Sequence, residues 1–264
     1  MNFSANKNIE SLNNPEYKFL VSLKKNRNRK SSNKSISEGF RECYKLLDSN
    51  YEIDTLYFCS DLFIGENNKD LLDECEQENI RIVKVSEKVF KAMSYRDRPD
   101  GFVAVFNTRD LSLPDKINGP ILIPDQIEKP GNLGTMIRTA KSFGINNIFL
   151  SDEITDIFNP NVIRASIGHV FNMNIWSSSN NKIRDFLNSN NYQILLLDPE
   201  GEESLENFKP ENNFAVVVGA EQYGISNEWF ENEYVALSIR STNNVDSLNA
   251  VSYTHLTLPT TPYV

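Results

Sequence analysis

Residues 120–151 read PILIPDQIEKPGNLGTMIRTAKSFGINNIFLS, and this stretch decides the fold class of the chain. It begins with the apolar run PILIP and ends with the apolar run NIFLS, and each run predicts a buried strand. Between them, Met136, Ile137 and Ala140 recur on one face of a helix, and Gly144 marks the end of that helix. A strand, a helix and a second strand in succession predict a parallel sheet covered by helices on both faces.

The same pattern continues after this stretch. The runs YQILLLD, FAVVVG and VALSIR, which begin at residues 192, 214 and 235, predict three more buried strands. In parallel sheets of this kind, ligands bind beyond the carboxyl ends of the strands. We therefore expect a functional site in the loops that follow four predicted strand ends, at Pro124, Asp198, Gly219 and Arg240.

The first 110 residues alternate strand and helix on a smaller scale. The runs TLYF, RIVKV and GFVAVF predict strands, and the helical segments DLLDECEQE and SEKVFKAMS separate them. Residues 1–110 are therefore predicted to form a small α/β domain. The segment LSLPDKINGP that follows holds two prolines and a glycine, so we place a linker at residues 111–119 and a second domain at 120–264.

Composition limits the class of protein. The 264-residue chain is long enough for two domains. Its three cysteines form no CxxC pair, so neither a disulfide framework nor a metal site is expected. We find no apolar run of about 18 residues and no signal-peptide core, so we expect a cytoplasmic protein without a membrane span. The formal net charge of −9 argues against nucleic acid as a partner, although net charge does not describe local patches.

One acid-free basic segment stands out against this acidic background. Residues 17–37 contain seven lysines and arginines and no acidic residue. This segment is either a solvated loop or an arm that contacts phosphates, and phosphate neutralisation requires clustered lysine and arginine. On the second interpretation, the side chains expected to bind nucleic acid are Lys24, Lys25, Arg27, Arg29 and Lys30.

Three of the expected site loops carry polar clusters. The first is DQIEKPGNLGTMIR at residues 125–138, the second is GAEQYGIS at 219–226, and the third is DSLN at 246–249. The glycine spacing of the first cluster fits neither a dinucleotide-binding loop nor a P-loop. Each cluster alone has an ordinary explanation, such as a surface helix residue or a capped turn. Their order and spacing together are specific.

In that order and spacing, the clusters resemble the motifs of the SpoU (TrmH) family of S-adenosylmethionine-dependent RNA ribose 2′-O-methyltransferases, in the SPOUT superfamily. The first motif is matched by Asn132, Gly134, Arg138, Phe143 and Gly144. An intermediate motif is matched by Arg164, Ala165, Ser166 and Gly168. The second motif is matched by Gly219, Glu221, Gly224, Ile225 and Ser226, and the third by Asp246, Ser247, Leu248 and Asn249.

The resemblance implies an α/β architecture: a C-terminal parallel-sheet SPOUT domain with a trefoil knot, preceded by a small α/β substrate-binding domain. It implies a homodimer with active sites near the subunit interface. It also implies that S-adenosylmethionine binds in the knot. The positions that match cofactor contacts are Leu197, Gly219, Ala220, Ile239 and Leu248.

The resemblance assigns activation of the ribose hydroxyl to Arg138. Because arginine is normally protonated, we expect Arg138 to stabilise the developing oxyanion rather than abstract a proton. The remaining catalytic set, expected to orient Arg138 and the ribose, is Asn132, Glu221, Ser247 and Asn249. The two-domain layout favours ribosomal RNA as substrate. A tRNA ribose methyltransferase and an RNA-binding protein with impaired catalysis are the alternatives.

The end of the chain departs from the family pattern. Ile239 is followed by Arg240, and Asn243 comes soon after, where the family has a proline and a glycine. The stretch VSYTHL that begins at Val251 is what the sequencing-adaptor end GTC TCT TAT ACA CAT CTG encodes. We therefore expect residues 251–264 to be non-native, and the chain as written to fold poorly or methylate weakly. A genuine short polar tail is the alternative.

Overall fold

The computed structural model describes residues 7–65, 68–210, 213–231 and 233–238. The third motif, the departures at Arg240 and Asn243 and the suspected tail all fall in residues 239–264, which lie outside the described residues. The trefoil knot stays a prediction.

The chain forms two compact units. The first comprises Met1–Arg109 together with Ile157–Asn172, and the second comprises Asp110–Asp156 together with Met173–Val264. We refer to them as the N-terminal unit and the C-terminal unit. The segment Ile157–Asn172, which the sequence places in the second domain, thus packs within the N-terminal unit.

Aromatic contacts explain this placement. The rings of Phe158 and Phe171 lie edge-on against Tyr51, at centroid distances of 6.0 and 5.4 Å. Both rings also contact Phe106, and the Ser35 hydroxyl donates to the carbonyl of Phe158 at 2.6 Å. Burying these rings removes a large apolar area from water, which periodicity along the chain does not reveal.

The N-terminal unit contains a five-stranded sheet of order β1-β4-β3-β5-β2, in which β5 is antiparallel to both of its neighbours. The strands are β1 (Lys7–Ile9), β2 (Lys34–Glu38), β3 (Ile53–Phe58), β4 (Arg81–Val85) and β5 (Phe102–Asn107). The three strands predicted from the sequence are therefore confirmed, and β1 and β2 are additional.

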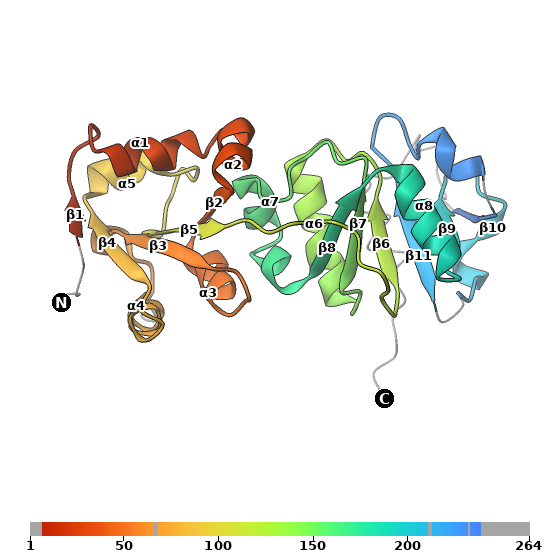
Figure 1. Ribbon diagram of the computed structural model, residues 1–264, viewed down its shortest axis with the longest axis horizontal. Helices are drawn as coiled ribbons and strands as arrows, with labels where there is room; N and C mark the ends of the chain where they lie inside the picture. The colour runs from red at the N-terminus through yellow and green to blue at the C-terminus, as the bar shows by residue number, and fades with distance from the viewer. Residues whose placement is uncertain (1–6, 66–67, 211–212, 232, 239–264) are drawn as a thin grey trace. The chain divides into compact units, whose positions relative to one another are not determined.

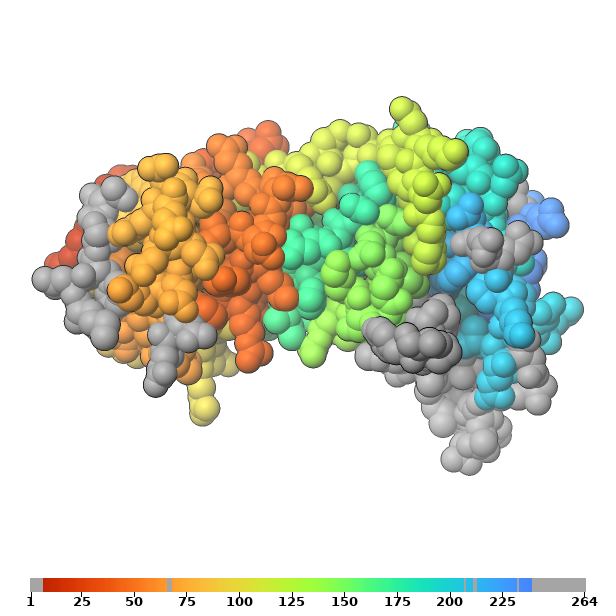
Figure 2. Space-filling model, turned by 90° about the horizontal axis from the view of Figure 1, so that it is seen from below, coloured from red at the N-terminus to blue at the C-terminus, as the bar shows by residue number. Residues whose placement is uncertain are grey.

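Helices cover both faces of this sheet. They are α1 (Pro15–Ser22), α2 (Asn26–Ser32), α3 (Phe40–Leu47), α4 (Asn68–Gln77) and α5 (Glu87–Met93). Helices α1 and α5 lie on one face, and α3 and α4 lie on the other (Figure 1). In the view from below, α4 lies on the surface nearest the viewer (Figure 2).

The basic segment is not a loop. It folds into α1, α2 and the beginning of β2, so the interpretation of this segment as a solvated loop is wrong. Helix α1 starts there because Pro15 occupies its first position and the Asn14 side chain accepts a hydrogen bond from the Glu16 amide. Three of the seven basic side chains make contacts within the unit: Lys34 forms an ion pair with Asp54, and the contacts of Lys24 and Arg29 are described below.

The C-terminal unit contains a seven-stranded sheet of order β10-β12-β9-β11-β6-β7-β8, and every described pair in it is parallel. The strands are β6 (Ile121–Pro124), β7 (Asn147–Ser151), β8 (Asn174–Ser178), β9 (Gln193–Leu197), β10 (Glu203–Ser204), β11 (Phe214–Val218) and β12 (Val235–Ser238). The predicted parallel sheet is confirmed.

Helices α6 (Pro130–Ser142) and α8 (Asn180–Ser189) follow strands of this sheet. The core beside it includes Ile123, Phe149 and Trp229. Leu113 and Ile117, from the segment expected to be a linker, pack against this core. Within the described ranges, every helix is too short or too polar to cross a bilayer.

Helix α7 (Pro160–Ala165) is shorter than predicted from the sequence, which extends it to Val170. Its start is as expected, because the Asn159 side chain accepts from the amide of Asn161. Its end comes early because Ile167 and Gly168 have φ angles of +51° and +72°. Such left-handed backbone cannot continue a right-handed helix.

Candidate active site

Asn132, Gly134 and Arg138 of the first motif lie on α6, which follows β6 after the loop 125–129; Phe143 and Gly144 directly follow the helix. Pro130 occupies the first position of the helix, where its missing N–H leaves no hydrogen bond unmade. Asn132 lies in the first turn and is half-buried, whereas Arg138 is exposed nearly two turns further on. Because the helix is rigid, the separation between these two functional side chains is set by its geometry.

The second motif forms a tight turn after β11. The amide of Ala220 donates to the carbonyl of Gly224 at 3.0 Å, and the amide of Gly224 donates back at 2.9 Å. Gly224 has a φ of +69°, which favours glycine. A Cβ added at Gly219 would lie 2.1 Å from the carbonyl carbon of Gly224. The two glycines therefore allow the turn that carries Glu221.

Asp125 holds this turn in place through a hydrogen bond to Ser226. Its carboxylate is fully buried at the end of β6. One oxygen accepts from the Ser151 hydroxyl at 2.7 Å, and the other accepts from the Ser226 amide at 2.9 Å. The Asn180 side chain also donates to the Ser226 hydroxyl, at 3.1 Å. Sequence reasoning missed this role of Asp125, although a carboxylate directly after a buried strand was a signal for it.

Glu221 joins the first and second motifs. Its carboxylate accepts a hydrogen bond from the Asn132 side chain, 89 residues away in the chain. The ammonium of Lys129 forms an ion pair with the other carboxylate oxygen. These contacts with Lys129 and Asn132 lower the pKa of Glu221, against a smaller opposing effect of burial. Lys129 was not among the predicted site residues, because nothing in its spacing indicates a partner.

Arg138 is a cation of the site whose side chain is open to a ligand. Its side chain is exposed, and its guanidinium has no hydrogen-bond or ion-pair partner among the residues that the structure describes. The structure thus brings Asn132 and Glu221 into contact and places Arg138 on the same helix as Asn132. The other two predicted catalytic residues, Ser247 and Asn249, lie outside the described residues.

The predicted cofactor positions that are described lie at one edge of the sheet. Leu197 ends β9, and Gly219 and Ala220 directly follow β11, which pairs with β9 in parallel. Leu197 and Ala220 are only 6% and 8% exposed. A small cavity of about 70 Å³ adjoins Ala220 and is also lined by Asn132 and Glu221. Ile239 and Leu248 fall outside the described residues.

The predicted nucleic-acid-binding residues separate into two groups. The side chains of Lys25, Arg27 and Lys30 are exposed at and along α2. Arg29 is only 3% exposed, and its guanidinium donates to the carbonyls of Leu23 and Lys24 at the end of α1.

The prediction that Arg29 contacts phosphate is therefore wrong, because the side chain holds the corner between α1 and α2. Lys24 is also engaged within the unit. Its ammonium donates to the carbonyl of Ser94 at 2.9 Å and lies 4.7 Å from the centre of the Tyr95 ring. Burial lowers the pKa of Lys24.

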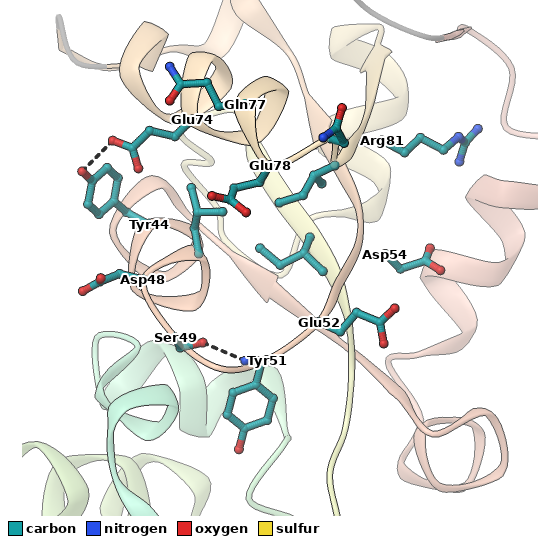
Figure 3. A pocket seen from close by; sticks show the side chains of 14 residues that line it. Tyr44, Asp48, Ser49, Tyr51, Glu52, Asp54, Glu74, Gln77, Glu78 and Arg81 are labelled. Carbon is teal, nitrogen blue, oxygen red and sulfur yellow. Dashed lines mark hydrogen bonds between the residues drawn. The ribbon is translucent and has the colours of Figure 1, made fainter.

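A cavity of about 770 Å³ opens in the N-terminal unit, between the ends of α3 and α4 and the starts of β3 and β4 (Figure 3). Five carboxylates line it: Asp48, Glu52, Asp54, Glu74 and Glu78. Its one arginine, Arg81, is already paired with Glu16 at 3.0 Å. A cavity of this charge repels phosphate, so it does not suit a polyanion.

Comparisons with known proteins match this chain to methyltransferase sequences and structures. A family model described as "SpoU rRNA Methylase family" matches residues 119–258, and one described as "MRM3-like substrate binding domain" matches residues 14–104. The 23S rRNA (guanosine(2553)-2'-O)-methyltransferase RlmP of Bacillus subtilis (strain 168) is 25% identical over 243 residues, which cover 92% of this chain and 94% of the relative.

Two solved structures have the same fold. The AdoMet-bound rRNA methyltransferase from Sinorhizobium meliloti aligns with a TM-score of 0.85 at 24% identity, over 95% of each chain. An RNA 2'-O ribose methyltransferase aligns with a TM-score of 0.82 at 27% identity, over 95% of this chain and 96% of the other.

The chain belongs to the SpoU rRNA Methylase family, whose model covers more than half of it. This membership confirms the predicted class of enzyme, an S-adenosylmethionine-dependent RNA 2′-O-methyltransferase. It also confirms the fold expected from the motifs, a parallel-sheet methyltransferase domain preceded by a substrate-binding domain.

The ion pair between Lys129 and Glu221 predicts a pH effect. A carboxyl group with a lowered pKa contributes stability that is present above its unfolded value of about 4.5 and is lost as pH falls through the folded value. Lys129→Met removes the main cause of the shift, so the variant should lack most of this stability above pH 4.5, and its stability should fall less steeply than that of the wild type below that pH. For an exposed pair we expect about 0.2–1 kcal/mol.

Unfolding by urea at pH values between 4 and 8 measures the difference. Lys141→Met is the control, because Lys141 lies on the same helix but donates to Asn146. It should leave the pH profile unchanged. Equal profiles for wild type and Lys129→Met would show that the ion pair does not form in solution.

Proposed function

We propose that this protein transfers a methyl group from S-adenosylmethionine to a ribose 2′-hydroxyl of ribosomal RNA. The observation that carries the proposal is the hydrogen bond between the side chains of Asn132 and Glu221, with Arg138 exposed on the same helix and without a side-chain partner among the described residues. This assembly lies at the carboxyl edge of a parallel sheet, where ligands of such sheets bind.

The residues at this edge fit the cofactor. Leu197 and Ala220 offer nearly buried apolar surface at the ends of neighbouring strands, which suits an adenine ring and an aliphatic chain. The half-buried Gly219, which follows β11, adds backbone without a side chain at the same edge. In the proposal, Ile239 and Leu248 complete this cradle. When bound, S-adenosylmethionine supplies an activated methyl group on a sulfonium.

Arg138 stabilises the oxygen that attacks this methyl group. A ribose hydroxyl is a weak nucleophile with a high pKa, so negative charge builds on its oxygen in the transition state. A guanidinium directed at that oxygen stabilises the negative charge and so lowers the free-energy barrier to methyl transfer. It does not have to accept a proton. Glu221, kept anionic by its lowered pKa, fixes Asn132 through a charged hydrogen bond. Ser247 and Asn249 orient the ribose in this proposal.

The N-terminal unit holds the RNA. Three exposed cations, Lys25 at the N-cap of α2 and Arg27 and Lys30 on it, form a phosphate-contacting surface on an otherwise acidic chain. The acidic cavity between the ends of α3 and α4 and the starts of β3 and β4 disfavours RNA there.

Ribosomal RNA is favoured over tRNA because the relative RlmP, whose name gives a 23S rRNA substrate, aligns along nearly its whole length. We infer that the enzyme works in the cytoplasm as a homodimer, as the family resemblance implies.

Methyl transfer tests the proposal directly. The purified chain is mixed with labelled S-adenosylmethionine and either ribosomal RNA or tRNA, both taken from cells that lack the gene. We expect label in ribosomal RNA at a single ribose, located by mapping 2′-O-methyl groups in cells with and without the gene. Label in tRNA alone would establish the alternative substrate. Calorimetric binding of S-adenosylmethionine without any methyl transfer would indicate impaired catalysis.

The exposed cations of α2 predict a salt dependence. Each phosphate neutralised on a single strand contributes about 0.7 to the slope of log affinity against log salt concentration. Replacing Arg27 and Lys30 by alanine should therefore lower that slope by about 1.4. Filter binding of ribosomal RNA fragments between 50 and 300 mM salt, roughly, measures it.

A control pair distinguishes local contact from a change in net charge. Lys69 and Lys84 are exposed on other elements of the same unit. Replacing both by alanine changes the net charge equally and should leave the slope as in the wild type. Equal slopes for the two double variants would refute the assignment of α2 as the phosphate-contacting surface.

A further inference from the structure

Tyr223 is the most exposed large hydrophobic side chain in the described part of the chain, at 73%. A single exposed aromatic residue on a protein surface needs no explanation by itself. The position of Tyr223 requires an explanation, because this residue lies on the turn that carries Glu221.

The turn holds Tyr223 in a defined place. Ala220 and Gly224, on either side of it, exchange two backbone hydrogen bonds. Tyr223 is two residues from Glu221, so their Cα atoms are at most about 7 Å apart. Glu221 is in turn tied to Asn132 and Lys129. The tyrosine ring is thus tethered beside the residues that the proposed function places around the target ribose.

The Tyr223 ring is without a packing partner in the described part of its unit. It makes no ring contact and no side-chain hydrogen bond with the described residues. Other aromatic side chains of the C-terminal unit do have partners: Phe149 and Trp176 pack edge-on, and Tyr234 packs on Phe230 at 5.4 Å. A free ring on a rigid turn is a surface on which a flat ligand can stack at low entropic cost.

We propose that Tyr223 is a stacking platform for an unpaired base of the RNA substrate, at or next to the nucleotide whose ribose is methylated. The inference rests on the proposed function in taking RNA as the ligand. Unstacked bases of single-stranded RNA bind proteins by stacking on aromatic rings. Tyr223 would therefore position the target nucleotide by its base, whereas Arg138 acts on its ribose.

Binding of two single-stranded probes tests the proposal. One is a 12-nucleotide oligoadenylate, and the other is the same ribose-phosphate chain without bases. Tyr223→Ala should weaken oligoadenylate binding roughly 5- to 150-fold, the range measured for loss of one stacked base. Tyr223→Phe retains the ring and should bind like the wild type. The base-free probe should bind all variants equally.

Tyr44→Ala is the matched control, because Tyr44 is an exposed tyrosine of the N-terminal unit that is bonded to Glu74. It should not alter binding of either probe. Unchanged oligoadenylate binding by Tyr223→Ala would overturn the proposal, and so would an equal loss for the base-free probe.

Methyl transfer separates this inference from the proposed function. With ribosomal RNA as substrate, Tyr223→Ala should raise KM while kcat and S-adenosylmethionine affinity stay near wild type. If Tyr223→Ala weakens binding of oligoadenylate alone, but the wild-type chain leaves ribosomal RNA unmethylated, the proposed substrate is refuted and stacking on Tyr223 is upheld. A wild-type chain that methylates ribosomal RNA, with KM unaltered by Tyr223→Ala, would refute stacking alone.

Discussion

Arg138→Ala is expected to lower kcat for methyl transfer about 10²- to 10³-fold, the usual loss when one donor to a developing oxyanion is removed. The affinity for S-adenosylmethionine should stay near wild type, because Arg138 lies on α6 and not on the turn after β11. The stability of the fold should also be unchanged, since Arg138 is exposed and has no partner among the described residues. Single-turnover methyl transfer and calorimetric cofactor binding measure the two effects separately.

Two further variants sharpen this prediction. Arg138→Lys retains the charge but loses the planar donor fork, so it should recover only part of the activity. Undiminished turnover in Arg138→Lys would contradict a role that depends on the guanidinium. Lys141→Ala removes another cation from the same helix, where it bonds Asn146, and should leave kcat unchanged.

Gly219→Ala is expected to have the second large effect, on cofactor affinity and on stability together. The added Cβ would lie 2.1 Å from the carbonyl carbon of Gly224 and 2.3 Å from the amide nitrogen of Ile225. Both neighbours are backbone atoms, so the turn must open. Forcing an extra carbon into a packed site typically costs about 1–3 kcal/mol of unfolding free energy.

Opening the turn should also displace Glu221 from Asn132, so we expect S-adenosylmethionine affinity and methyl transfer to fall at least tenfold. Gly131→Ala is the matched control, because a Cβ there meets nothing within 4 Å and the position is helical. That substitution should be neutral or should stabilise the fold by up to about 1 kcal/mol. Wild-type behaviour of Gly219→Ala would show that the turn is not built as described.

Some elements could be predicted from the sequence because they are buried on both faces. Strands β6, β7, β9 and β11 are continuous apolar runs, and such runs identify parallel strands without knowledge of their partners. Strand β8 was missed because it lies at the edge of the sheet and is mostly half-buried, so its residues NIWSS carry no apolar run.

The basic segment shows where composition misleads. A run of lysines and arginines without acids was interpreted as a solvated loop or arm, yet it contains α1 and α2. Arg29 is buried there because its guanidinium satisfies two carbonyls at the end of α1. Whether a cation in such a run contacts a backbone carbonyl or the solvent depends on how two helices meet. The amino-acid composition does not contain this information.

The sequence by itself determined the class of fold and the residues that define the family, because strand periodicity and motif spacing are properties of the chain order. Only the tertiary structure decided how those residues act together. It joined Asn132 to Glu221 and added Lys129 and Asp125 to the site. The physical reason is that hydrogen bonds and ion pairs between distant segments depend on distances, and these exist only once the strands have paired in register.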